Sequence, residues 1–354
     1  MNASVCRTLV LFLLLALPFA RQSIAQQGDY FLNSPAMQKF AVILGGAAAE
    51  KKYEDRFREW TLKLYDTLSQ DYRYSADHIS LLFGTGDPQE PRISDACRLE
   101  TIEELMSSLQ AKVKPGDQII FFIVGHGTSD GEEAKFNIVG PDISGHRFAE
   151  LLAAFSEQNL IVVNTTSSSY LFVQALSAPG RILISATRSR AEKYDTIFAS
   201  SIIEALANHA ADMDKNTRLS LWESFQYARK TTEKWYNDQE RLPTEHPALD
   251  DNGDGVLSTD PDPSTNDGRL AQIAYLDLLK SSLPTEFSTG KNAESARQLM
   301  AQMLDFERSI LLLRNRKDDL LKDEYYQQLE PLLIKLARTT RKFRNLQKSS
   351  ASSR

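Results

Sequence analysis

The stretch that decides the fold reads Ile119-Ile120-Phe121-Phe122-Ile123-Val124-Gly125-His126-Gly127. Its unbroken apolar run predicts a strand that is buried on both faces of a sheet. The glycines on either side of the histidine let the backbone turn sharply and let a substrate approach the main chain closely. We therefore expect His126 at the carboxyl end of this strand, where an imidazole can accept a proton from a nucleophile. The alternative is a turn histidine that only ends the strand.

Similar apolar runs alternate with helical patterns between residues 38 and 285. The expected strands cover residues 40–44, 79–83, 118–124, 160–164 and 181–186. The expected helices cover residues 48–70, 99–111, 145–156, 170–176 and 196–210. This alternation predicts an α/β domain in three layers, with a mostly parallel sheet flanked by helices. Ligands of such folds bind beyond the carboxyl ends of the strands, which is where His126 is expected.

The C-terminal part differs in pattern. An irregular loop at 259–268 precedes a helical stretch at 270–283. From 292 to 346, apolar residues recur at helical spacing in two series, separated by a polar segment at 315–319. This pattern predicts an α-helical hairpin, with Pro331 placed to start or kink its second helix. We expect the α/β domain to span 38–285, the hairpin 286–346 and a flexible tail 347–354.

Composition and charge limit the possible functions. With 354 residues the chain has room for about two domains of ~150 residues each. Its net charge of −6 argues against polyanion binding by the chain as a whole. Residues 291–354, however, carry a net charge of +6. This basic region predicts a solvated helix face, or docking onto the acidic body or a partner, or self-association through the hairpin; nucleic acid is not expected.

The first 25 residues are typical of a secretory signal peptide. Arg7 precedes an apolar run at 9–20, and Ser23-Ile24-Ala25 supplies small residues for cleavage. We expect export to the periplasm or the extracellular space, an extension at 26–37, and no membrane-spanning segment after cleavage; an uncleaved anchor is the alternative. Cleavage removes Cys6, so Cys97 alone remains, which excludes a disulfide-dense scaffold and a cysteine-based zinc cluster.

A second apolar strand, 160–164, leads into Asn164-Thr165-Thr166-Ser167-Ser168-Ser169. With His126-Gly127, this segment resembles the caspase-like cysteine peptidases, and within them the legumain family. In that family one strand ends in His-Gly and the next in a short segment with the catalytic cysteine. Thr166 stands where the resemblance places that cysteine, over a likeness that covers residues 38–255. The resemblance implies a peptide-binding groove at the strand ends, formed in part by His126, Gly127, Thr166 and Ser168.

The hydroxyl of Thr166, in place of the thiol that the resemblance implies, leaves three hypotheses for the function. A thiol is partly ionised near neutral pH, whereas an alcohol needs a well-oriented base. The first hypothesis is a catalytically impaired pseudo-peptidase that binds a peptide or partner protein in the strand-end crevice. The second is an active hydrolase that uses Thr166, Ser167 or Ser168 as nucleophile and His126 as base. The third is a structural module in which these residues have no chemical role.

Residues 212–223 have the ligand spacing of an EF-hand calcium loop. Thr217 occupies the position where the sharp turn of such loops favours glycine, which would weaken binding. The oxygen ligands, including the Arg218 backbone carbonyl, would come from Asp212, Asp214, Asn216, Arg218, Ser220 and Glu223. An acidic loop that caps the following helix is the alternative.

A second, weaker calcium candidate is Asp250-Asp251-Asn252-Gly253-Asp254-Gly255. Its ligands would be Asp250, Asn252 and Asp254, but it lacks a glutamate at its twelfth position, where Pro261 stands. A turn built on Asx hydrogen bonds explains the same residues without a metal. No cofactor other than Ca²⁺ is indicated.

Overall fold

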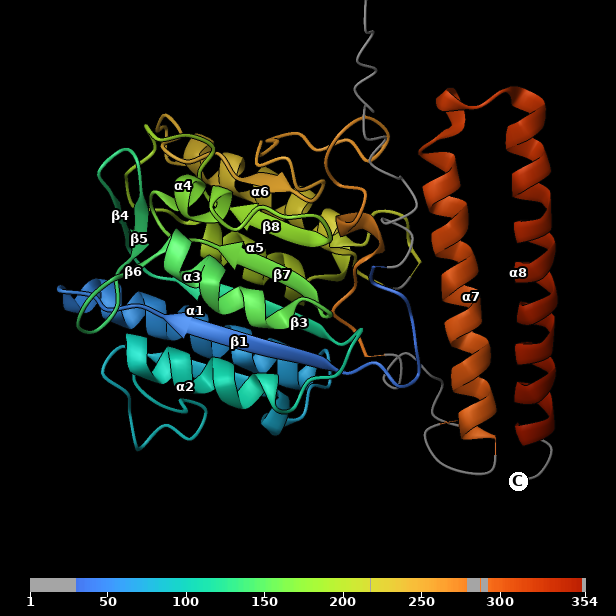
Figure 1. Cartoon of the computed structure of the whole chain (residues 1–354), viewed down its shortest axis with the longest axis horizontal. Coiled ribbons are helices and arrows are strands. Elements are labelled where there is room, and N and C mark those ends of the chain that lie inside the picture. Colours follow the sequence, from blue (N-terminus) through green and yellow to red (C-terminus); the bar gives the residue numbers. More distant parts are fainter. Residues whose placement is uncertain (1–29, 217, 279–286, 288–291, 352–354) are drawn as a thin grey trace, which may run out of the picture.

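The structure is a computed structural model that describes residues 30–216, 218–278, 287 and 292–351. The predicted signal peptide, the first residues of the expected N-terminal extension and residues 352–354 lie outside the described residues. The rest forms an α/β body and a two-helix hairpin, which lies at one end of the molecule (Figure 1).

A six-stranded sheet forms the centre of the body, in the order β2-β1-β3-β7-β8-β9. Its strands are β1 (Lys39–Gly45), β2 (Ile79–Phe83), β3 (Gln118–Val124), β7 (Asn159–Asn164), β8 (Arg181–Ser185) and β9 (Ala248–Asp250). The first five are parallel, and only β9 pairs antiparallel, with β8. This arrangement confirms the predicted α/β class with its mostly parallel sheet.

Helices cover both faces of this sheet because the apolar side chains of each strand point alternately to the two sides. In β3, Ile120 and Phe122 pack on one face, whereas Ile119 and Phe121 pack on the other. The first face is covered by α1 (Lys51–Gln70), α5 (Phe198–Ala207) and α6 (Leu221–Asp238). The second is covered by α2 (Leu99–Gln110), α3 (Gly145–Leu152) and α4 (Ser169–Gln174).

Short elements supplement this framework. A three-stranded sheet follows β3 directly and contains β4 (Gly127–Ser129), β5 (Ala134–Phe136) and β6 (Ile143–Ser144). The 3₁₀ turns are η2 (Ala76–His78), η3 (Ala153–Phe155), η4 (His209–Ala211), η5 (Ala271–Ile273) and η7 (Lys317–Asp319). Because β4 begins at Gly127, the segment after His126 leaves the central sheet for the smaller one.

The helix predicted over 270–283 is wrong for most of its described part. Only η5 is helical, Ala274 is extended, and residues 279–283 lie outside the described residues. The Tyr275 carbonyl accepts hydrogen bonds from Lys39 Nζ at 2.6 Å and Gln118 Nε2 at 3.1 Å. Lys39 and Gln118 lie at the start of β1 and β3, and their hydrogen bonds to this carbonyl replace the backbone hydrogen bond that it would accept in a helix. The segment after η5 therefore crosses the amino ends of these strands. Burial lowers the pKa of Lys39 to about 8.

The hairpin consists of α7 (Ala293–Arg314) and α8 (Lys322–Ala351). Its two helices and the polar link between them agree with the sequence prediction. However, α8 continues to Ala351, into the expected flexible tail, and Pro331 lies inside α8 rather than at its start. α7 contacts the body. Leu311 and Leu312 pack against the hydrophobic core that α1, α5 and α6 form with the sheet, and the buried Arg308 donates a hydrogen bond to the Tyr30 carbonyl. Within the described part of the chain, no helix has the length and apolarity needed to cross a bilayer.

Candidate functional site

The two strand ends singled out in the sequence lie side by side. β3 and β7 are hydrogen-bonded neighbours, and Ile123 pairs with Asn164. Beyond them, Ser167 Oγ donates to the Gly127 carbonyl at 3.0 Å and accepts from the Gly127 N–H at 3.1 Å. A Cβ on Gly127 would lie 2.8 Å from Thr166 Oγ1, so only glycine fits between the two tips. The structure thus brings the His126-Gly127 and Thr166–Ser168 segments together.

His126 lies against two aromatic rings of α1. The edge-on rings of Tyr53 and Phe57 have their centroids 4.7 and 5.0 Å from the imidazole. Its Nδ1 is 3.4 Å from Asp195 Oδ1, while the other Asp195 oxygen accepts a hydrogen bond from Arg56 at 2.9 Å. Burial lowers the pKa of His126, and Arg56 adds to this effect while Asp195 opposes it. The lowered pKa favours the neutral imidazole, and Asp195 lies beside one of its nitrogens.

Asp195 is a site residue that the sequence analysis did not find. It lies in the loop between β8 and α5, whose neighbouring Thr196 hydroxyl donates to the Thr165 carbonyl at 2.6 Å. A signal for it exists, because this loop follows a predicted strand and so reaches the same edge of the sheet as His126. Loop conformation, however, decides which of its side chains faces the imidazole. An orienting acid beside a histidine is one part of a catalytic triad.

Of the three hydroxyl groups considered as nucleophiles, those of Thr166 and Ser167 are hydrogen-bonded to other groups. Thr166 is buried, and its Oγ1 donates to Asn164 Oδ1 at 2.8 Å. Ser167 binds the Gly127 backbone, as described above. The backbone of Ser168 is left-handed, with φ 57°, and its hydroxyl makes no hydrogen bond to any described residue. Among the described contacts, no hydroxyl is hydrogen-bonded to the imidazole, so base and nucleophile are not joined.

A second acid–histidine pair lies at the same edge. His246 Nδ1 is hydrogen-bonded to Glu192, whose other oxygen accepts from the Arg188 N–H at 2.9 Å. The Glu192 carbonyl in turn accepts from the Ser168 N–H at 3.3 Å. Next to this pair, burial raises the pKa of Glu245 to about 7. These groups hold the loops around the strand ends, and nothing in the sequence pattern distinguished them.

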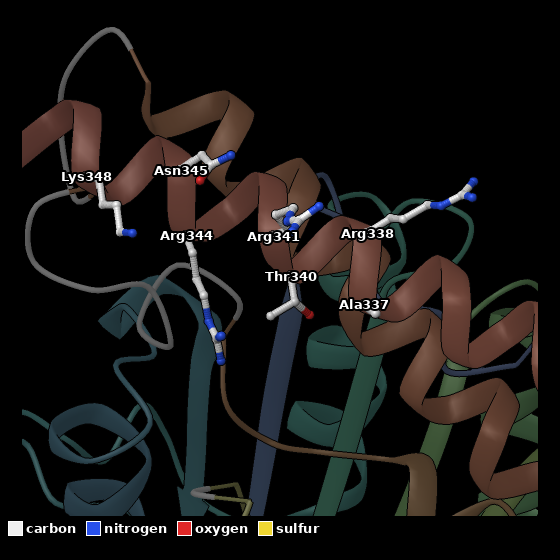
Figure 2. Close-up of a pocket in the computed structure, with 7 residues that line it drawn as sticks. All are labelled: Ala337, Arg338, Thr340, Arg341, Arg344, Asn345 and Lys348. Atoms are coloured by element: carbon white, nitrogen blue, oxygen red, sulfur yellow. The ribbon is translucent and has the colours of Figure 1, made fainter.

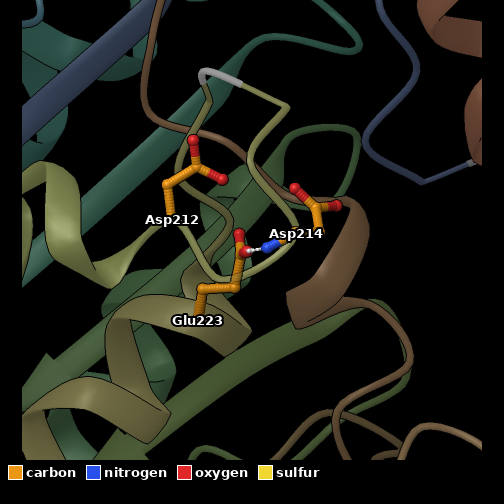
Figure 3. Close-up of side chains that lie close together, drawn as sticks. All are labelled: Asp212, Asp214 and Glu223. Carbon is orange, nitrogen blue, oxygen red and sulfur yellow. Dashed lines mark hydrogen bonds between the residues drawn. The ribbon is translucent and has the colours of Figure 1, made fainter.

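The first predicted calcium loop gathers three carboxylates. Oxygens of Asp212, Asp214 and Glu223 all lie within 4.8 Å of one another (Figure 3), so this cluster could hold a metal ion. Burial raises the pKa of Asp214, and the charges of Glu223 and Asp212 contribute in the same direction. The Asn216 N–H donates to Asp212 and Asp214, which closes the loop around these carboxylates. Thr217 lies outside the described residues.

Two other members of this loop have additional partners. Ser220 Oγ accepts from the Glu223 N–H, and the Glu223 carboxylate accepts from Ser220, so the pair forms a capping box at the start of α6. The Arg218 guanidinium forms two 2.9 Å hydrogen bonds with Asp277 and lies 3.8 Å from the ring centroid of Tyr275. The capping alternative is therefore realised alongside the carboxylate cluster.

In the second predicted loop the carboxylates bind the chain itself. Asp250 accepts from the Gly253 and Gly255 N–H groups and from Ser177 Oγ, the last at 2.6 Å. Asp254 accepts from Asn252 Nδ2 at 3.2 Å. Within the described ranges, Asp250 and Asp254 do not belong to a cluster of three potential ligands. These are the hydrogen bonds expected of an Asx turn.

No protein-family model matches this chain, and no curated protein is similar to it in sequence. Its function must therefore be argued from the strand-end geometry and the carboxylate cluster.

Proposed function

We propose that this chain is an exported, catalytically impaired relative of the caspase-like, legumain-type peptidases, and that it binds a peptide or partner protein in the crevice beside His126. The observation that carries the proposal is the orientation of Thr166. Its hydroxyl is buried and donates to Asn164, although it lies on the strand tip next to His126. An alcohol in this position lacks the activated partner that attack on a carbonyl requires.

Other parts of a peptidase site support the family hypothesis. Asp195 Oδ1 lies 3.4 Å from His126 Nδ1, which is where an acid that orients the base would stand. A Cβ on Gly127 would lie 2.1 Å from the Ser167 carbonyl oxygen, so the neighbouring strand tip itself requires the glycine of the His-Gly motif. The Gly127 and Thr166 N–H groups, which could bind a substrate carbonyl, donate to Ser167 Oγ and Asn164 Oδ1 in this structure. What acyl transfer lacks in addition is a reactive nucleophile. A cysteine at 166 would supply it, because a thiol ionises far more readily than an alcohol.

The test is to restore that group. We expect Thr166→Cys to gain measurable cleavage of an Asn- or Asp-containing peptide library, while the wild type shows none. The double variant His126→Ala, Thr166→Cys should be inactive, and Asp195→Asn combined with Thr166→Cys should lose at least about tenfold in rate, as expected for a group that orients the base. Ser168→Cys is the matched control, because it adds a thiol on the same turn away from the family's cysteine position.

Binding without cleavage is measured on the same library. The immobilised wild-type protein should retain intact peptides, and His126→Ala should retain fewer. His126-dependent hydrolysis by the wild type, abolished by Ser168→Ala or Thr166→Ala, would instead establish the second hypothesis, an active hydroxyl hydrolase. The free hydroxyl of Ser168 is the one observation that favours this alternative. Retention of no peptide at all would leave only a structural module.

We also propose that the loop at 212–223 binds calcium. The proposal rests on the three carboxylates gathered within 4.8 Å, because oxygen-rich sites of this kind suit Ca²⁺. A dissociation constant of ~10⁻⁴ M would suffice in a calcium-rich extracellular medium.

A chelator should lower the melting temperature of the wild type, and Glu223→Gln should abolish this sensitivity. Glutamine keeps a side-chain oxygen that can cap α6, so loss of the cap alone does not explain the result. Asn252→Ala, in the second loop, is the control and should leave the response to the chelator unchanged. An identical melting temperature with and without chelator would exclude a stabilising calcium site.

A further inference from the structure

Four cations lie in the second half of α8 at intervals of three or four residues: Arg338, Arg341, Arg344 and Lys348. Residues at this spacing share one side of a helix. Together with Ala337, Thr340 and Asn345 they line a cavity of about 630 Å³. Figure 2 shows all seven side chains on α8, with the guanidinium groups of Arg338 and Arg344 extended away from the helix. We call these four cations the arginine face.

The arginines of this face have no anionic partner among the described residues. Arg338, Arg341 and Arg344 are exposed, and none forms a hydrogen bond or ion pair with any residue in the described part of the chain. No acidic residue follows Glu330 in the sequence. Elsewhere in the chain, by contrast, Arg218 forms paired hydrogen bonds with a carboxylate. Unpaired guanidinium groups offer planar pairs of donors that suit phosphate oxygens.

The shape of the face favours an extended anionic surface over a single small ion. From Arg338 to Lys348 the helix rises about 15 Å, which spreads the cations along a line. Exposed apolar side chains lie on the same side toward the start of α8: Ile334 one turn before Arg338, and Tyr326 two turns earlier, with the exposed Glu330 between them. Basic residues beside exposed aliphatic and aromatic side chains are typical of helices that lie at a lipid interface.

The charge distribution of the molecule points the same way. Residues 26–290 carry a net charge of −14 and residues 291–354 one of +6. The hairpin lies at one end of the molecule (Figure 1) and contacts the segment before β1, whereas His126 follows the carboxyl end of β3. An anionic surface would therefore attract the hairpin and repel the body.

We propose that the arginine face docks the protein onto the phosphate headgroups of an anionic lipid bilayer. The hairpin then lies against the membrane surface without crossing it, and the carboxyl end of β3, which His126 follows, lies away from the lipid. This role does not depend on the proposed function of the crevice.

Vesicle flotation tests this proposal on the full chain. Vesicles of phosphatidylcholine with 30% phosphatidylglycerol should carry the protein at low salt, and about 0.5 M NaCl should release it. Pure phosphatidylcholine vesicles report any attachment that does not depend on the arginine face, including that of the apolar N-terminal run. Arg341→Gln with Arg344→Gln should weaken binding about 25-fold, because each surface cation contributes about a factor of five.

The matched control is Lys335→Gln with Lys342→Gln, which also removes two charges from α8. These lysines flank Arg338 rather than Arg344, and Lys335 lines a different cavity, beside Pro331 and Leu332, so this pair should weaken binding less than Arg341→Gln with Arg344→Gln does. Arg338→Gln alone should weaken vesicle binding about fivefold, and melting curves show whether the variants fold.

Three results would overturn the proposal: equal loss of vesicle binding in the two double variants, no preference for anionic vesicles, or release by 10 mM inorganic phosphate at constant ionic strength. Binding to polyglutamate without binding to vesicles would assign the face to an acidic protein.

Discussion

Asp267 shows how a single buried carboxyl group links pH to stability. The residue is almost fully buried, and its Oδ1 accepts the Asp251 N–H at 3.1 Å. Burial raises the pKa of Asp267 to about 7, with the charges of Asp251, Asp250 and Asp254 adding to the effect. In the unfolded chain this group ionises near its ordinary value of about 3.9. Its contribution to stability is therefore complete below pH ~4 and is lost as the pH rises through about 7.

We expect Asp267→Asn to stabilise the protein at pH 8 and to leave it unchanged at pH 4. Asparagine keeps the Oδ1 that accepts the Asp251 N–H and removes the charge. The gain at pH 8 should be on the order of 1 kcal/mol, or a rise in melting temperature of about 2–4 °C. Thermal melts in a chelator at both pH values measure this gain in stability.

Asp262→Asn is the control. Hydrogen bonds from Ser264 lower the pKa of this exposed carboxyl, so loss of its charge should not stabilise the protein. Equal effects at the two pH values would contradict the prediction.

The elements of the body differ in how well the sequence predicted them. β2 and β3 have the predicted bounds, β1 is one residue longer at each end, and β7 and β8 differ by one residue at one end. The agreement is close because each is a buried apolar run with a clear contrast to its neighbours. The strands of two or three residues, β4, β5, β6 and β9, were not predicted. A strand this short has almost no period of its own, and its pairing depends on residues distant in the chain, such as the Leu183–Asp250 pair.

The residues of the candidate site also differ in how well the sequence predicted them. His126 and Thr166 were found because each follows a long apolar strand, and parallel strands bring their carboxyl ends to one edge. Asp195 and Glu192 were not, because they lie on a loop whose course is fixed by tertiary contacts such as the bond from Thr196 to the Thr165 carbonyl. Sequence also could not show that the Thr166 hydroxyl donates to Asn164. That choice of rotamer depends on packing between neighbouring strands.

For the molecule as a whole, the relation between body and hairpin matters most. α7 is attached at its middle, where Asp305 Oδ1 accepts hydrogen bonds from the backbone N–H of Asn33 at 3.0 Å and from its Nδ2 at 3.4 Å. Arg308, one turn later, reaches the Tyr30 carbonyl. Both partners belong to the segment before β1, so a few polar contacts and the Leu311–Leu312 packing connect the hairpin to the sheet. An interface of this kind should open without unfolding the body.

We therefore expect Asp305→Ala to loosen the hairpin selectively. Removing the carboxylate leaves two donors of Asn33 without their acceptor, which costs about 1–2 kcal/mol. Amide hydrogen exchange of peptides from 293–314 should then accelerate about tenfold, while peptides from β3 and β7 keep their rates. Asp305→Asn retains an oxygen that can accept the backbone N–H of Asn33 and should restore most of the protection. Glu294→Ala, which removes an exposed ion pair with Arg297 on the same helix, should change neither region. If exchange rises equally in β3, hairpin and body unfold as one unit, and α7 is part of the core rather than attached to it.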